Sequence, residues 1–280
     1  MLRSLATALC LSLPLVACTT VEQPSRNEYA LYEAALRAGG NLRTEIEPED
    51  APFSNADLVT NFHRIALHHE ADIERDGSEE NSVPNRLGRW EQDINYRLVG
   101  SGVTPETELE VREFARRLER LTGRSFRPAE EDINFLILIT DPDERPEVAD
   151  MLGEVMPALG RSFDRWRQSK SLICVATNLY RNTSDDRIVF GMVMMGSELG
   201  PLMRSSCLHE ELVQALGLGN DHSEVRPSIF NDDEEFALLT RHDEYLLRIL
   251  YDPRLKSGMT AAEAMPIVRE IIADLRPDDG

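Results

Sequence analysis

Between residues 90 and 216 the chain alternates between segments that resemble β-strands and amphipathic segments of helical length. The segment INFLILIT at 133–140 is apolar at nearly every position, as expected of a strand buried on both faces. The pattern predicts strands over 90–99, 133–140, 171–180 and 188–195, and helices over 104–123, 146–166 and 202–216. We therefore expect an α/β fold with a mixed sheet of about four strands and a long helix after the last strand.

Further helices are predicted on both sides of this region. Ser54 and Thr240 each precede an Asp at the third helical position, as in a capping box. Apolar residues at helical spacing predict helices over 29–38, 54–73 and 240–252 and another from residue 260. The sequence thus predicts one domain over 54–280 with helical extensions at both ends, and a tether with a short helix over 18–53.

The first eighteen residues have the pattern of a targeting segment. Arg3 supplies a positive charge, residues 4–14 are largely apolar, and Leu15-Val16-Ala17-Cys18 places small residues before a cysteine. This tetrapeptide resembles a bacterial lipobox, which implies a signal peptide over 1–17 and lipid such as palmitate on Cys18. Thr19 follows in place of Asp, which by the same resemblance favours the periplasmic side of the outer membrane. The alternative is an ordinary secretory signal.

Charge restricts the classes of partner. With 50 acidic and 30 basic residues, the formal net charge is −20. Such a chain is repelled by nucleic acids and by anionic membrane surfaces. We expect the partner to be a protein or a cell-envelope ligand, and we expect membrane contact through the lipid anchor only.

The cysteines support a placement outside the cytoplasm. Cys10 would leave with the signal peptide and Cys18 would carry lipid, so Cys174 and Cys207 remain as a pair. An even pair in an oxidising compartment favours a disulfide. The alternative is two buried free thiols.

The candidate site lies in 207–221, CLHEELVQALGLGND. On a helix, Glu210 and Gln214 are four residues apart and share one face. Gly217 would end the helix and turn the chain back, which brings Asn220 or Asp221 near that face. A polar network that locks the helix to this turn is the simplest role for these residues.

The same segment resembles the zincin helix, in the extended H-E-x-x-H-x-x-G-x-x-H form of matrixin-like metalloproteases. Glu211 lies at the general-base position, and Gly217 matches the turn glycine. The strand order before the helix and the spacing over 239–251 also fit, so the resemblance covers about 90–252 and implies a zincin-like fold. Glu210, Gln214 and Asn220 occupy the positions of the three metal ligands. His222, two residues after Asn220, is a displaced candidate for the third ligand.

These replacements change the expected chemistry. Zinc prefers imidazole and thiolate ligands, whereas carboxylate and amide oxygens suit Mn, Mg or Ca. Ser228-Ile229-Phe230 stands where the methionine turn would be. We expect a degenerate, non-catalytic domain that binds a partner or envelope ligand beside 210–221, with no cofactor. The alternative is a hydrolase or peptidase that uses a divalent metal and Glu211 as general base.

A second resemblance covers the same region. The core E-E-L-x-Q-x-L-G-L-x-N-D at 210–221, the segment P-S-I-F-N-D at 227–232 and the cysteine pair are together similar to the domain of unknown function 2927 family of proteobacterial lipoproteins. Membership implies a lipoprotein and no particular activity.

The remaining polar residues have structural interpretations. His63, His68 and His69 lie on a predicted helix, where 68 and 69 point in different directions and do not share a metal. His242 falls in the first turn of a helix. The acidic run 232–235 lacks the spaced order of a calcium loop and is predicted to be solvated.

Overall fold

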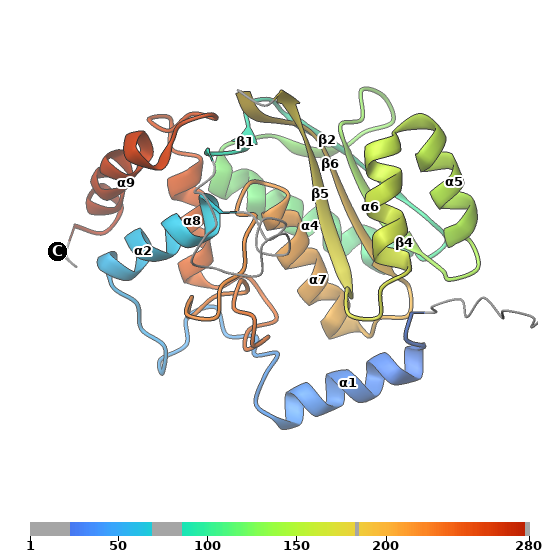
Figure 1. Cartoon of the computed structure of the whole chain (residues 1–280). Helices are drawn as coiled ribbons and strands as arrows, with labels where there is room; N and C mark the ends of the chain where they lie inside the picture. The colour runs from blue at the N-terminus through green and yellow to red at the C-terminus, as the bar shows by residue number, and fades with distance from the viewer. Residues whose placement is uncertain (1–22, 69–85, 183–184, 278–280) are drawn as a thin grey trace, which may run out of the picture.

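The computed structural model describes residues 23–68, 86–182 and 185–277. These residues form the expected α/β fold around one sheet (Figure 1). Six of the described segments are strands: β1 (Arg89–Trp90), β2 (Ile94–Val99), β3 (Phe126–Pro128), β4 (Phe135–Thr140), β5 (Cys174–Asn182) and β6 (Asp185–Gly196). The expected number of about four is therefore too low.

Five of these strands run parallel to their neighbours, in the order β1-β6-β4-β2-β3. β5 pairs antiparallel with β6, with Cys174 opposite Met195. None of the other described strands pairs with the second edge of β5. Among the described strands, β5 is therefore an edge strand of the sheet.

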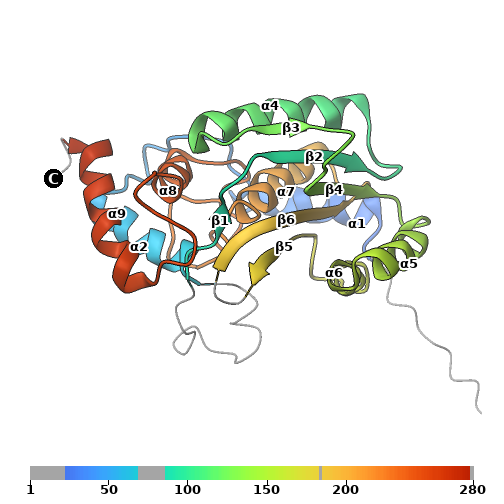
Figure 2. The same cartoon turned by 90° about the horizontal axis from the view of Figure 1, so that it is seen from above.

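The helices around the sheet are α4 (Pro105–Thr122), α5 (Arg145–Val155), α6 (Pro157–Arg167) and α7 (Pro201–Gln214). Side chains alternate between the two faces of β4, because successive residues of a strand point in opposite directions. Ile137 and Ile139 belong to the core that contains the apolar residues of α4 and α7. Leu138 belongs to a second core with α5 and α6. Seen from above, α4 and the pair α5–α6 flank opposite sides of the sheet (Figure 2).

The larger core continues into the terminal helices α2 (Asn55–Ala66), α8 (Arg241–Leu250) and α9 (Ala261–Leu275). α2, α8 and α9 begin at the capping boxes of Ser54, Thr240 and Thr260. These helices pack beside one another at the end of the sheet (Figure 1).

The remaining helix, α1 (Arg26–Ala38), lies along one side of the body (Figure 1). The segment before it also contacts the body, since the Gln23 amide donates to the Trp166 carbonyl oxygen (2.7 Å) and accepts from Arg145 (3.0 Å). From Gln23 onward, the segment expected as a tether is bound to the domain.

Three of the predicted elements differ from those in the structure. The strand over 90–99 is two strands, because a bend at 91–93 lets β1 pair with β6 while β2 pairs with β3 and β4. The helix over 146–166 is α5 and α6, separated at Met156 (φ −137°, ψ 80°), because a residue before proline is driven out of the helical region. The helix over 54–73 ends at Ala66, and 69–73 lie outside the described residues.

None of the helices in the described ranges is long and apolar enough to cross a membrane.

Candidate functional site

A cleft of about 280 Å³ lies where β5, α7 and the segment after α7 meet. One wall is formed by 171–176, at the start of β5. The second wall is α7, and the third is made by residues between 221 and 236, with Leu42 closing one end. The candidate segment 207–221 therefore borders a cavity that three separate parts of the chain build.

The α7 wall contains most of the predicted site residues. Glu210, Glu211 and Gln214 all line the cleft, as does Asp221 from the turn that follows. The Gln214 amide donates to both carboxylate oxygens of Asp221, at 3.0 and 3.2 Å. The expected link between the helix and the 220–221 turn is thus present.

The turn after α7 depends on a glycine. Gly217 has a φ of +115°, which side-chain-bearing residues rarely adopt, and a Cβ there would overlap the Gly88 carbonyl oxygen. The carbonyl oxygens of this turn accept hydrogen bonds from the Trp90 indole at Ala215 (2.9 Å) and from the Tyr251 hydroxyl at Leu216 (2.8 Å). The direction in which the chain leaves α7, and hence the position of Asp221, is fixed by these contacts.

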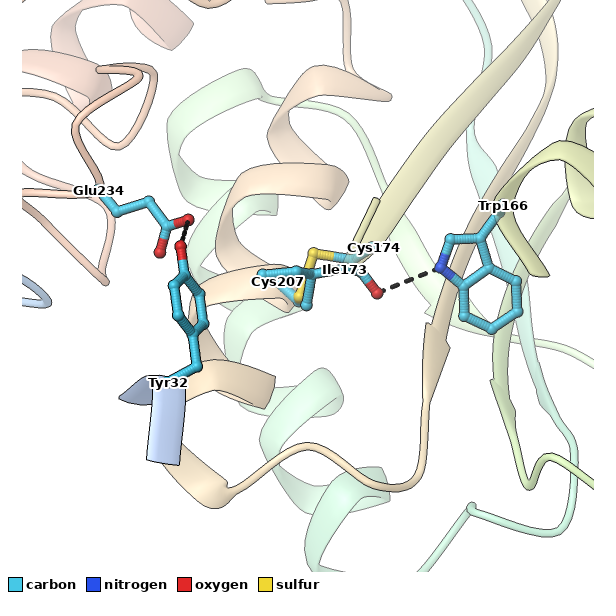
Figure 3. Close-up of a disulfide and its surroundings, with 6 residues drawn as sticks. All are labelled: Tyr32, Trp166, Ile173, Cys174, Cys207 and Glu234. Carbon is cyan, nitrogen blue, oxygen red and sulfur yellow. Dashed lines mark hydrogen bonds between the residues drawn. A yellow bond between two sulfur atoms is a disulfide. The ribbon is translucent and has the colours of Figure 1, made fainter. Parts of the chain in front are cut away.

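A disulfide joins two walls of the cleft. Cys174 at the start of β5 is bonded to Cys207 in α7, as predicted (Figure 3). On the far side of β5, the Trp166 indole of α6 donates to the Ile173 carbonyl oxygen at 3.1 Å (Figure 3). The start of the edge strand is therefore held from both faces of the sheet.

The third wall is anchored on the buried carboxylate of Asp243 in α8. This carboxylate accepts from the Ser228 hydroxyl (2.6 Å), the Ile229 amide (3.1 Å) and the Thr240 amide and hydroxyl (both 2.9 Å). Asn231 donates to two carbonyl oxygens of the loop at 3.1 Å. The cleft residues Ile229 and Asn231 are thus held in place by hydrogen bonds to α8 and within the loop.

The cleft is acidic. Among the residues that the structure describes, no Lys, Arg or His lines it, whereas five carboxylates do: Glu210, Glu211, Asp221, Asp232 and Glu234. Glu234 accepts a hydrogen bond from the Tyr32 hydroxyl of α1 at 3.0 Å (Figure 3). Burial raises the pKa of Glu234, and the hydrogen bond from Tyr32 acts in the opposite direction. A positively charged group is the complement of such a lining.

Two of the predicted site residues lie elsewhere. Asn220 is buried and does not line the cleft; its amide donates to the Arg64 carbonyl oxygen of α2 at 3.0 Å. His222 does not line the cleft either, and its Nδ1 accepts from the Glu224 amide at 3.1 Å. The structure therefore brings together Glu210, Glu211 and Gln214 but not the full set.

The other histidines make structural contacts. His209 stacks on Phe114 (centroids 3.9 Å apart), its Nδ1 accepts from the Leu239 amide (3.0 Å), and burial lowers its pKa to about 3. His242 is buried and bonds Asn61 at 3.0 Å. His63 and His68 pack edge to face, and His69 lies outside the described residues.

The acidic run 232–235 divides between two roles. Asp232 and Glu234 line the cleft, whereas Glu235 pairs with Arg43 (3.0 Å) and Arg226 (2.6 Å). These ion pairs lower the pKa of Glu235. The prediction of a solvated acidic loop therefore holds for the exposed Asp232 and Asp233, but it misses that Asp232 and Glu234 line the cleft and that Glu235 makes ion pairs.

A comparison with protein families identifies the chain. The model of a family described as protein of unknown function (DUF2927) matches residues 55–270. The chain belongs to the DUF2927 family. Neither a curated protein nor a solved structure matches it. The matched range begins at α2 and ends within α9, so it contains the sheet and most of the cleft, while α1 and Leu42 precede it.

The cleft of this DUF2927 protein does not fit a zinc ion. Zinc sites are built mainly from His and Cys, and a carboxylate ligand in a catalytic site is accompanied by His. Here both cysteines of the cleft are in a disulfide, and the Gln214 amide donates to Asp221. Among the described residues, no group of three or more His, Cys, Asp or Glu side chains is arranged to hold a metal ion.

Several contributors to the cleft were not predicted from the sequence, and three of them make its walls or its charge. They are the edge 171–176, Glu234 and Leu42. The strand itself was predicted, but its place beside α7 depends on antiparallel pairing with β6, which periodicity does not specify. The cysteine pair was the available signal, because a Cys174–Cys207 bond requires β5 and α7 to be adjacent.

Proposed function

We propose that this DUF2927 protein is a lipid-anchored binding protein of the cell envelope, whose cleft binds a positively charged segment of an extended polypeptide. The observation that carries the proposal is the lining of the cleft, in which the described part of the chain supplies five carboxylates and no basic side chain. Charge-assisted hydrogen bonds to carboxylates are about twice as strong as neutral ones, so an ammonium or guanidinium group is the favoured ligand.

The shape of the cleft supports an extended ligand. One wall is the start of the edge strand β5, and exposed strand edges bind extended peptides through main-chain hydrogen bonds. Apolar side chains of Ile173, Val175 and Phe236 also line the cleft. A peptide with basic and apolar residues would find partners for both in one site.

The proposed location rests on the N-terminal sequence. Cleavage before Cys18 and lipid on that cysteine would place the domain on the periplasmic side of the envelope, in an oxidising compartment where the Cys174–Cys207 bond persists. Incorporation of labelled palmitate tests this step. Wild type is expected to carry label and to sediment with membranes, whereas Cys18→Ser is expected to lose both properties.

The second candidate is the metal-dependent hydrolase. It is favoured by the position of Glu211, whose side chain reaches the same cleft as Glu210 and Gln214. Binding and hydrolysis separate in one assay, in which peptide is incubated with the protein and Mn²⁺ or Zn²⁺ and analysed by mass spectrometry. Intact peptide supports the binding protein, and cleavage that Glu211→Gln abolishes would establish the hydrolase.

The binding proposal is tested with a fluorescent peptide of alternating Lys and Val and its Glu analogue. Fluorescence anisotropy is expected to detect binding of the Lys peptide only, more strongly at low ionic strength. Glu210→Gln with Asp232→Asn should weaken binding about tenfold, the loss expected for one charge-assisted contact.

The matched control is Glu147→Gln with Glu154→Gln, two exposed positions on α5 that remove the same charge away from the cleft. Equal binding of the Lys and Glu peptides, or equal weakening by both double variants, would refute the proposed role of the cleft.

A further inference from the structure

The outward face of α1 carries no charged side chain. At 100° per residue, one arc of about 140° on this helix contains only exposed, uncharged residues: Asn27, Ala30, Leu31, Ala34, Ala35 and Ala38. Leu31, within this arc, is 72% exposed. The outer face of a surface helix is ordinarily polar and charged, so this face has the character of a contact surface.

The opposite face of α1 is fixed to the domain. Tyr29 is buried in the larger core, and Leu36 packs against that core. The Arg26 guanidinium donates to the Ser197 carbonyl oxygen at 2.8 Å, and the Tyr32 hydroxyl donates to Glu234. The orientation of the helix is therefore set by the body of the protein, and its uncharged face is directed outward.

The chain distance from the anchor limits what this face can reach. Four residues lie between Cys18 and Gln23, so Gln23 is five residue steps from the anchor, and it is hydrogen-bonded to Trp166 and Arg145. Five residues of fully extended chain span at most about 18 Å. A lipid on Cys18 would therefore hold the bilayer surface within about 18 Å of Gln23, just before the start of α1.

We infer that the outward face of α1 is a membrane-contacting surface that lies on the lipid bilayer. The inference rests on the proposed lipid at Cys18. It extends the expectation that the lipid anchor is the only membrane contact. The occupant is lipid rather than protein because the anchor places this face next to the bilayer.

The charges on α1 agree with this occupant. Arg37 flanks one side of the uncharged arc, where its guanidinium group can reach lipid phosphates. The two arginines of α1, Arg26 and Arg37, balance its two acids, Glu28 and Glu33, so the net charge of the helix is zero. The formal net charge of the whole chain is −20. α1 is thus a part of an acidic protein that an anionic surface does not repel.

This placement fixes the cleft relative to the membrane. Tyr32 of α1 bonds Glu234, and Leu42, four residues after α1, lines the cleft together with Glu234. A membrane against α1 would put this end of the cleft next to the bilayer surface. The ligand would then be recognised close to the membrane rather than far out in the periplasm.

The test uses the full chain, isolated with its lipid and reconstituted into vesicles of phosphatidylethanolamine and phosphatidylglycerol. Leu31→Cys provides a thiol for an environment-sensitive dye, and lipids with nitroxide-labelled chains serve as quencher. Val155→Cys is the matched control, because Val155 is also 72% exposed and lies at the far end of α5 from Arg145, the contact of Gln23. Quenching at position 31 is expected to exceed that at 155 about twofold or more.

A second pair of variants tests the apolar character of the face. With the dye on Ala38→Cys, adding Leu31→Glu is expected to reduce quenching to the level of the 155 control, and adding Val155→Glu is expected to leave it unchanged. Equal quenching at 31 and 155 in protein that floats with the vesicles would overturn the inference and leave the anchor intact. Protein that does not float would refute the anchor, and the inference with it.

Discussion

His209 makes the stability of the fold depend on pH in a way that can be isolated. Its ring is stacked on Phe114 and bonded to the Leu239 amide, and burial, with a smaller effect of Arg117, lowers its pKa from 6.5 to about 3. The unfolded chain therefore binds a proton at this ring between about pH 6.5 and pH 3, while the folded protein does not. Stability is full above pH 6.5 and is lost as the pH decreases through this window.

The size of the effect follows from the two pKa values. The ring stays neutral in the folded state and has a pKa of about 6.5 in the unfolded chain. Its protonation in the unfolded chain therefore lowers the free energy of unfolding by about 2 kcal/mol between about pH 7 and pH 5. One edge of the ring reaches a surface groove on α4, where solvent reduces the penalty of charging it. We expect a loss of about 1–2 kcal/mol from this residue.

Urea unfolding of wild type and His209→Asn at both pH values provides the measurement. Asn retains an acceptor for the Leu239 amide but does not titrate, so its lost stacking lowers stability equally at both pH values and cancels in the difference. The variant is expected to lose about 1–2 kcal/mol less than wild type on acidification. An identical loss in both proteins would show that His209 is not the group responsible.

Three further predictions concern the walls of the cleft. Replacing Cys174 and Cys207 by Ala should lower the unfolding free energy by about 3–4 kcal/mol, from the separation of 33 residues, as measured by urea unfolding without reductant. Gly217→Ala should cost about 2–3 kcal/mol or prevent folding, because of its positive φ and the backbone oxygen beside it, and a Tm equal to that of wild type would contradict this. Gln214→Ala should lower the free energy of unfolding by about 1 kcal/mol, measured by thermal unfolding, because it removes the bond to Asp221. Peptide binding should weaken only as far as this loss of stability lowers the folded fraction.

The sequence predicted those parts of the fold in which a local pattern decides the structure. The capping boxes of α2 and α8, the start of α9 at residue 260 and the doubly buried strand β4 occur where they were expected. The strand β3 was missed, because its three residues are too few to show a period. The separation of α5 from α6 was readable in principle, since Pro157 removes Met156 from the helical region.

The candidate site was predicted only in part, for a physical reason. Gly217 and the four-residue spacing of Glu210 and Gln214 are local features, and they place the helix face and the turn correctly. Which of two adjacent turn residues points into the cleft depends on the turn backbone and on a contact with α2, more than 150 residues away along the chain. Asp221 therefore takes the position that the pattern left open between Asn220 and Asp221, and that the zincin resemblance gave to Asn220.

The acidic lining of the cleft and the bonds that fix its walls both favour the binding of a cationic ligand. Neighbouring carboxylates repel one another, so a flexible cleft would relax by separating them. Here the Cys174–Cys207 bond holds two walls together, and the Asp243 carboxylate holds the third. Carboxylates whose positions are fixed in this way attract a cationic ligand, and a ligand that binds only the folded state stabilises it. A cationic peptide should therefore raise the Tm of the protein, and the increase should be smaller at high ionic strength, because salt screens the attraction between the peptide and the cleft.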